Sequence, residues 1–357
     1  MKYRILFFLI LITLFISCDS NKLDSILSVS ISNLPIDFLN ISEVTNEIIP
    51  IELELTDESI IGEWQQGYRI IISKKHIVFF DNNNNTPKIL LFTEDGRFVR
   101  VIGKKGQGPG EYTSIGDIAV DEMKNLIYII CPTKILTFSF DGELIAEHLS
   151  SLKLYEEANF MNGELQLLVS SIHQEREREY VRRVNLFTAN ENIITIDSMS
   201  IFEESLKQKV IVTPTVRDYL TFSDGKKYLY YPIELGRLDI PNFCDTLFEI
   251  KNQQLIPSVK IIFDGKYMRP TSVFKTSRFV FVIGHRIDYR ECSFCYDADT
   301  ERTYNLTDGF MDDIHTNTKV RIRPNPLNSN LFYYLFNNIG GDGEELNPTL
   351  FIGKFKL

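Results

Sequence analysis

Histidine, cysteine and tryptophan are scarce in this sequence, and this narrows the chemistry that the chain can perform. Its 357 residues include five histidines, five cysteines and one tryptophan. No histidine lies two or four residues from another, so no local pair of metal ligands exists. We therefore expect neither a bound metal nor a cofactor. The histidines are His76, His148, His173, His285 and His315.

Common catalytic and phosphate-binding motifs are also missing. The chain has no Gly-x-Ser-x-Gly elbow of the kind that exposes a serine nucleophile. The glycine-rich stretch 106–110 is not followed by Gly-Lys-Ser/Thr, so it does not match a phosphate-binding P-loop. Acidic residues are abundant, at 48 in the chain, so a pair of catalytic carboxylates stays open as an alternative.

Cys292 and Cys295 form a CxxC motif within a β pattern. Redox-active motifs of this kind sit at a helix N-terminus, which lowers the pKa of the thiol. On a strand, residues three apart point to opposite faces. A disulfide would therefore need a turn at Ser293-Phe294, and a structural bridge and two free thiols both remain open.

Apolar runs long enough to suggest a membrane signal are confined to the N-terminus. Lys2 and Arg4 precede an apolar segment at 6–16, which is too short to span a bilayer as a helix. Ser17-Cys18 after this segment resembles the lipobox of bacterial lipoproteins. The resemblance implies a signal peptide over 1–17, lipidation of Cys18 and a tether over 18–46. The alternative is an ordinary secretory signal.

The charge of the chain argues against one class of partner. The net charge is −10, and loss of residues 1–17 removes two positive charges and leaves −12. Nucleic-acid binding depends on neutralising phosphates with basic residues. We therefore expect no nucleic-acid partner. The membrane contact that we expect is made through the lipid anchor.

A repeat with an offset of 46 residues is the most informative feature that is present. The pattern at 88–92 and 95–99 returns at 134–138 and 141–145. Each copy places Asp-Gly, at Asp95-Gly96 and Asp141-Gly142, between two apolar stretches, which predicts a hairpin with a tight turn. A β repeat of about 40–50 residues is typical of a propeller blade.

The remaining patterns extend this repeat along the chain. No segment keeps an apolar period of 3.6 residues, so we expect an all-β fold. We predict a six-bladed β-propeller of four-stranded blades over 47–357. The N-terminal strand Glu47–Leu55 is expected to pair with C-terminal strands and close the ring. The expected blades cover 67–102, 115–145, 160–200, 216–263 and 272–306, with 331–337 and 350–356 in the last.

Three motifs carry a family resemblance. They are Gly106–Tyr112 (GQGPGEY), Asp117–Asp121 (DIAVD) and Cys244–Ile250 (CDTLFEI). Together they resemble the six-bladed propeller lipoproteins of Bacteroidetes, which look related to NHL-repeat propellers. The resemblance covers nearly the whole mature chain and implies the fold. It implies very little about activity, because fold and function separate easily.

The longer predicted loops all fall on one face of the propeller, where they would form a binding surface. These loops cover 81–87, 171–179, 234–244, 285–292 and 337–347. Arg and His would donate to a polar or anionic ligand, and an aromatic ring would give a flat surface. The candidate ligand-binding residues are Lys105, Glu111, Tyr112, His173, Arg176, Arg237, His285 and Arg286.

A second interpretation of the glycine-rich loop is purely structural. Glu111 and Tyr112 would then only hold the loop in place. The residues expected to shape turns are Gly96, Gly142, Gly108 and Pro109.

The sequence thus predicts a lipid-anchored binding protein of the cell envelope, either periplasmic or surface-exposed. Its partner would be a glycan, a peptide or an envelope protein. The alternative is a hydrolase or lyase that gathers carboxylates or histidines from several blades at the central channel. An enzyme should show such groups together at the channel mouth, whereas a binding module should show exposed aromatic side chains there.

Overall fold

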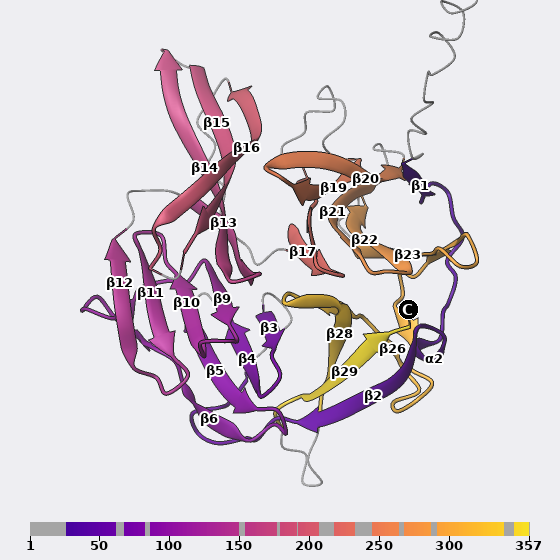
Figure 1. The fold of residues 1–357 in the computed structure, drawn as a ribbon. Coiled ribbons are helices and arrows are strands. Elements are labelled where there is room, and N and C mark those ends of the chain that lie inside the picture. Colours follow the sequence, from indigo (N-terminus) through magenta and orange to yellow (C-terminus); the bar gives the residue numbers. More distant parts are fainter. Residues whose placement is uncertain are drawn as a thin grey trace, which may run out of the picture.

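The chain folds into a ring of six antiparallel sheets, seen face-on in the computed structural model (Figure 1). We refer to each sheet as a blade, numbered in chain order from the first complete one. The prediction of a six-bladed β-propeller with four-stranded blades is confirmed. The structure describes residues 26–61, 68–82, 86–149, 154–176, 179–190, 192–206, 218–232, 245–263, 268–286, 291–338 and 346–356.

Blades 1 and 2 contain the sequence repeat, and their strands run outward in chain order. Blade 1 consists of β3 (Tyr68–Ile72), β4 (His76–Asp81), β5 (Lys88–Thr93) and β6 (Phe98–Val101). Blade 2 consists of β9 (Asp117–Asp121), β10 (Leu126–Ile130), β11 (Lys134–Ser139) and β12 (Leu144–Leu149). The glycine-rich loop between them contains β7 (Lys104–Lys105) and β8 (Glu111–Tyr112), which pair in parallel.

The two Asp-Gly turns are equivalent, as the repeat requires. Gly96 and Gly142 have φ of 87° and 79°. In each turn the glycine amide donates to the carbonyl three residues earlier, over 3.0 Å to Thr93 and to Ser139. Only glycine takes this conformation without strain, so the local backbone accounts for both residues.

Blade 3 departs from the predicted pattern. It consists of β13 (Leu154–Met161), β14 (Glu164–Arg176), β15 (Glu179–Ala189) and β16 (Thr195–Leu206). A single strand over 160–170 was expected, but the chain turns back at Asn162-Gly163, where φ is 53° and 82°. Asn-Gly is a strong hairpin signal for this reason. The strand over 154–161 was missed because this turn was not recognised.

Blades 4 and 5 follow, and blade 4 has short inner strands. Blade 4 consists of β17 (Leu220–Ser223), β18 (Lys226–Leu229), β19 (Thr246–Lys251) and β20 (Gln254–Ile262). Blade 5 consists of β21 (Met268–Lys275), β22 (Phe279–Arg286), β23 (Glu291–Asp297) and β24 (Arg302–Asn305).

Blade 6 joins the two ends of the described chain. It consists of β27 (Arg323–Asn325), β28 (Asn328–Phe336), β29 (Thr349–Phe355) and the N-terminal β2 (Thr45–Glu52). β2 pairs antiparallel with β29, so the expected ring closure is present. The hairpin of β25 (Phe310–Met311) and β26 (Lys319–Val320) precedes this blade.

Residues 27–44, which we expected to belong to a tether, are folded against the ring. β1 (Leu27–Ser30) adds a fifth strand to blade 4 by pairing in parallel with β20. The chain then follows the outside of the ring to the short helix α2 (Ile41–Val44), as Figure 1 shows. Apolar side chains such as Val29, Leu39 and Ile41 are buried there, which gives the segment its reason to dock.

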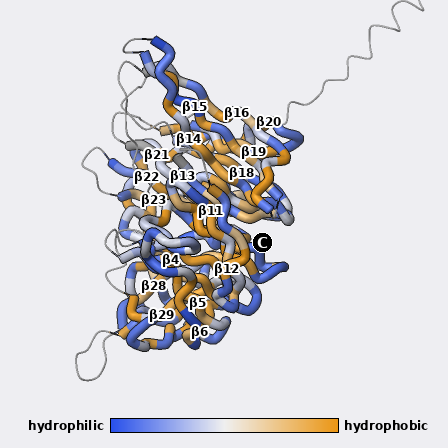
Figure 2. Tube along the Cα trace, turned by 90° about the vertical axis from the view of Figure 1, so that its left-hand side faces the viewer, coloured by the Kyte–Doolittle hydropathy of each residue, from blue (hydrophilic) through white to orange (hydrophobic). Residues whose placement is uncertain are grey.

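The core consists of apolar layers between neighbouring blades. Each layer draws on the facing sides of two sheets, as in the cluster of Ile71, Val78, Ile118 and Ile129 between blades 1 and 2. The apolar segments lie within the body of the ring, whereas many loops and the outer end of β14–β15 are hydrophilic (Figure 2). The strand pattern places alternate residues in different layers.

The CxxC motif shows this alternation directly. Cys292 packs into the layer between blades 4 and 5, while Cys295 packs into the layer between blades 5 and 6. Both cysteines are buried, and neither is in a disulfide. Of the two alternatives left by the sequence, the structural bridge is therefore not formed.

Candidate functional site

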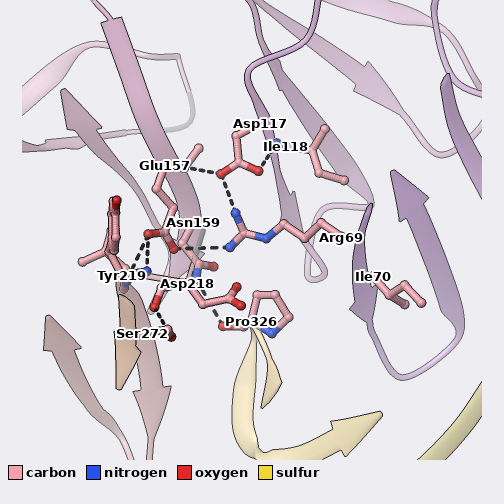
Figure 3. Close-up of polar contacts among 12 residues, drawn as sticks. Arg69, Ile70, Asp117, Ile118, Glu157, Asn159, Asp218, Tyr219, Ser272 and Pro326 are labelled. Atoms are coloured by element: carbon pink, nitrogen blue, oxygen red, sulfur yellow. Dashed lines mark hydrogen bonds and ion pairs between the residues drawn. The ribbon is translucent and has the colours of Figure 1, made fainter. Parts of the chain in front are cut away.

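A buried cluster of charged side chains lies at the centre of the ring (Figure 3). Arg69, at the start of β3, forms ion pairs with Asp117 of β9 and Glu157 of β13. The Nη2 atom of Arg69 lies 3.4 Å from Oε1 of Glu157. All three side chains are at most 2% exposed, so the cluster is out of contact with solvent.

Backbone amides occupy much of the remaining acceptor capacity of these carboxylates. Asp117 accepts hydrogen bonds from the amides of Ala158 and Ile118, each over 2.8 Å. Glu157 accepts from the amides of Tyr219 and Leu220, over 2.7 and 3.0 Å. The cluster therefore joins the inner strands of blades 1 to 4, where each strand would otherwise meet only its neighbours.

Burial dominates the electrostatics of the cluster. It raises the pKa of Asp117, although Arg69 and the backbone amides pull that pKa down. Burial also raises the pKa of Glu157 well above its usual value, and Arg69 counters this only in part. For Arg69 burial opposes the charge, but the two carboxylates outweigh it and the pKa is raised.

This arrangement resembles an acid–base pair in composition but not in access. Two carboxylates with raised pKa values close to one arginine are what a catalytic site would contain. General acid–base catalysis also requires the group to come within hydrogen-bond reach of a substrate. Asp117 and Glu157 are 1% and 0% exposed and already accept several hydrogen bonds. Arg69, Asp117 and Glu157 therefore form a structural link between blades, which we call the clasp.

A second buried cluster joins blades 3 and 4. Nη2 of Arg182 lies 2.7 Å from Oε1 of Glu156, and the hydroxyl of Tyr231 donates to Oε2 over 2.8 Å. Nε of Arg182 donates to the hydroxyl of Ser170 over 3.1 Å. Arg182 and Glu156 are 3% and 7% exposed. This cluster has the same structural role between the next pair of blades.

The described residues contain no group of three or more histidine, cysteine or carboxylate side chains placed to hold a metal ion. The part of the chain that the structure describes also has no helix long and apolar enough to cross a membrane.

Comparison with known proteins places the chain in a family. The model of a domain of unknown function, DUF4934, matches residues 27–340. The chain belongs to the DUF4934 family. No curated protein matches it.

Two of the solved structures similar to this DUF4934 chain come from Bacteroides. One is a protein of Bacteroides fragilis described as exported, with 17% identity and a TM-score of 0.60 over 93% of this chain and 100% of that one. Another is a protein of unknown function from Bacteroides caccae, with 12% identity and a TM-score of 0.37 over 79% and 93%. At this identity, the first supports the fold alone.

The glycine-rich loop of the DUF4934 chain is held by its own side chains. Glu111 accepts a hydrogen bond from the amide of Gly108 over 2.9 Å. Tyr112 is 1% exposed, and its hydroxyl donates to the carbonyl of Pro87 over 3.3 Å. Our expectation that Tyr112 offers a flat face to a ligand is corrected, because the ring packs into the core between blades 1 and 2.

The other described candidates are exposed and share one face. Lys105 lies in the loop that leads from blade 1 to blade 2. His173 and Arg176 lie at the end of β14, and His285 and Arg286 at the end of β22. In antiparallel blades, these strand ends lie on the same side as the loops between blades. We call this side the long-loop face.

Two candidates fall outside the described residues, namely Arg237 and the lipidation candidate Cys18. Pro109 lies at a turn of the glycine-rich loop, next to Gly110, whose φ is 71°.

Sequence reasoning missed the charged residues of the ring centre. A weak signal existed, since Arg69 interrupts the apolar strand Tyr68–Ile72 and Glu157 lies within the apolar stretch of β13. A charged residue near the start of the inner strand of several blades would have drawn attention to the axis. Asp117 was part of a motif that we used only to identify the fold.

Proposed function

We propose that this DUF4934 chain is an exported, lipid-anchored protein of the cell envelope that binds a partner through its long-loop face. The observation that carries this proposal is the outgrowth of blade 3. β14 and β15 have 13 and 11 residues, against five or six for the matching strands of blades 1 and 2. Figure 1 shows this hairpin extending well beyond the ring.

The outer end of the hairpin is polar and exposed. His173, Gln174, Glu175 and Arg176 are all exposed at the end of β14. A hairpin of this length buries little of its outer part, so folding alone gives no reason to extend it. Polar side chains on a rigid two-stranded support suit recognition of a glycan, a peptide or an envelope protein.

The same face also carries exposed apolar side chains in blade 6. Phe336, at the end of β28, is 36% exposed, and Leu346, just before β29, is 45% exposed. A mixed polar and apolar surface is typical of a protein-binding site. The alternative of a hydrolase or lyase loses support, because the buried carboxylates Asp117 and Glu157 are engaged in contacts between blades.

The binding proposal is tested with a double variant at the hairpin end. His173→Ala with Arg176→Ala should reduce binding to glycans on an array, or to a partner in envelope extracts, at least tenfold. The matched control is Lys251→Ala with Asn252→Ala, at an exposed turn on the opposite face. Equal loss in both double variants, or no loss in either, would count against the long-loop face.

The anchor is tested separately. Cys18→Ala should leave the protein without a lipid and move it from the membrane fraction to the soluble fraction. A Cys18→Ala protein that is still acylated and sediments with membranes would rule out Cys18 as the lipid site.

A further inference from the structure

Asp218 is a carboxylate at the ring centre that the clasp does not use. Its backbone carbonyl accepts a hydrogen bond from the hydroxyl of Ser272 over 3.0 Å. The next two amides donate to Glu157. Blades 3 and 5 therefore fix the backbone on both sides of Asp218. Its side chain is only half-buried and forms no hydrogen bond or ion pair with any described residue.

Arg323 is a guanidinium in a comparable position on blade 6. It is the first residue of β27, and its Cζ atom lies 4.5 Å from the ring centroid of Tyr68. Its Nη1 atom donates only a long hydrogen bond of 3.4 Å to the carbonyl of Tyr68. No carboxylate of the described residues lies within ion-pair distance of it. The aromatic ring holds the guanidinium without neutralising it.

The charges around the axis are separated by sign. Arg323 and Arg69 lie on the adjacent blades 6 and 1, whereas Asp117, Glu157 and Asp218 lie on blades 2, 3 and 4. Among the described residues, Arg69 is compensated by Asp117 and Glu157, so Asp218 and Arg323 remain as one charge of each sign without an ion-pair partner. Burial opposes the charge of Arg323, but Tyr68, Tyr333 and Asp218 outweigh it and raise its pKa.

Both groups lie on the long-loop face, because each precedes or begins the inner strand of its blade. Figure 3 shows the carboxylate of Asp218 drawn beside the cluster of Arg69, Asp117 and Glu157. The buried Nε–H of Arg69 also donates to no acceptor among the described residues. Among the described residues, the ring centre thus presents one carboxylate, that of Asp218, and one guanidinium, that of Arg323, without an ion-pair partner.

We infer that Asp218 and Arg323 form a binding site for a small zwitterion, namely a free amino acid. Its ammonium group would bind Asp218 and its carboxylate would bind Arg323. A guanidinium binds a carboxylate through paired, charge-assisted hydrogen bonds. A ligand with a single charge would leave one of the two partly buried groups uncompensated, which is costly. This inference rests on the proposed function only in assuming that the long-loop face binds a ligand.

The test is calorimetric titration of the purified full chain with probes of increasing charge separation. Glycine, β-alanine and 4-aminobutyrate place the two charges progressively further apart, while ethylamine and acetate carry one charge each. At least one zwitterion should bind with Kd below about 1 mM at low salt. Ethylamine and acetate should bind at least tenfold more weakly.

Variants assign the binding to the two side chains. Asp218→Asn and Arg323→Gln should each weaken binding of the best zwitterion at least tenfold. If Arg323→Gln does not fold, Arg323→Lys takes its place and should weaken binding by its loss of paired donors. Arg302→Gln is the matched control, because Arg302 also lies 4.5 Å over a tyrosine ring but is paired with Asp37.

Three results would overturn the inference. The first is no heat of binding with any zwitterion at about 10 mM, roughly ten times the expected Kd limit. The second is an affinity for acetate equal to that for the zwitterions, and the third is unchanged affinity in both site variants.

The His173→Ala with Arg176→Ala protein separates the two proposals. It should keep its affinity for the zwitterion while it loses the envelope partner. Partner binding without zwitterion binding would leave the proposed function standing and reject this site alone.

Discussion

Arg69 and Arg183 each bind two carboxylates, yet one set is buried at the ring centre and the other is exposed on blade 3. The side chain of Arg69 is 1% exposed, and that of Arg183 is 39% exposed. Nε and Nη2 of Arg183 lie 2.6 and 3.2 Å from their partners. The partners are Asp117 and Glu157 for Arg69, and Glu203 and Glu175 for Arg183.

The difference shows that environment, more than composition, decides what such a cluster contributes. Exposed ion pairs contribute about 0–1 kcal/mol because water and salt screen them. In a buried cluster, removal of one partner leaves a charge without compensation and costs about 3–5 kcal/mol. The cluster around Arg69 is therefore a structural element, whereas that around Arg183 is a surface feature of the hairpin.

The two Asp-Gly turns differ in the same way. A Cβ atom added to Gly96 would lie 2.1 Å from the carbonyl oxygen of Glu52, on the neighbouring β2. At Gly142 the nearest atom would be Cδ of Arg100, at 3.1 Å, which belongs to a flexible side chain. The two turns therefore have the same backbone conformation, but Gly96 packs against the backbone of β2 and Gly142 only against a flexible side chain.

The largest effect is expected from Arg69→Ala. It should lower the free energy of unfolding by about 3–5 kcal/mol, because Asp117 and Glu157 lose their buried counter-charge. Urea denaturation with an unchanged m-value measures this. A loss below about 1 kcal/mol would mean that the buried cluster stabilises the fold no more than the exposed cluster does. This would contradict the effect of burial argued above.

Gly96→Ala should follow, with a loss of about 2–4 kcal/mol from positive φ and from overlap with the backbone of β2. Gly142→Ala is its matched control and should lose about 1–2 kcal/mol from positive φ alone. Thermal or urea unfolding of both variants gives the difference. Equal losses would mean that β2 moves aside at no cost.

The pH dependence of stability should reveal the buried carboxylates. Burial raises the pKa of Glu157 in the folded state, so the folded chain holds this proton more tightly than the unfolded chain. The stability that this gives is full below the unfolded pKa of about 4.3 and is lost as pH rises through the folded pKa. The expected slope is at most about 1.4 kcal/mol per pH unit.

Glu157→Gln should therefore flatten the decline of unfolding free energy as pH rises above the unfolded pKa of about 4.3, measured by urea denaturation at a series of pH values. Glu203→Gln, in the exposed cluster, should leave the slope unchanged. A Glu157→Gln profile parallel to that of the parent protein would contradict a raised pKa at this position.

The smallest effect is expected from Arg183→Ala. It should leave the free energy of unfolding almost unchanged, and the change should shrink further at high salt, where exposed ion pairs are screened. Urea denaturation at low and high ionic strength measures both. A loss of several kcal/mol would show that the hairpin depends on this pair for its own folding.

Much of the fold could be predicted from short-range signals. The turns at Asp95-Gly96 and Asp141-Gly142 depend on a backbone conformation that neighbouring residues determine, so the sequence reveals them locally. The turn at Asn162-Gly163 carries the same signal and was overlooked, which cost one strand of blade 3. The docking of β1 on blade 4 had no such signal, because it depends on a distant strand edge.

The candidate site could be predicted only in part. Loop positions follow from strand order, so the shared face of His173 and His285 was accessible from the sequence. The burial of Tyr112 was not, because it depends on how closely blades 1 and 2 pack. No sequence pattern singled out Asp218, because its proposed role depends on which charged groups lie around it in the folded ring.

The propeller can be predicted from strand periodicity, glycine turns and an offset of 46 residues, because these signals act within or between adjacent segments. The set of charges that meet at the axis cannot be predicted in this way, because it depends on how the blades are arranged in space. Arg69, Asp117, Glu157, Asp218 and Arg323 come from five blades, and their contacts exist only once the ring has closed. Burial then changes their energies, because a charge that water no longer solvates must find its compensation in the protein.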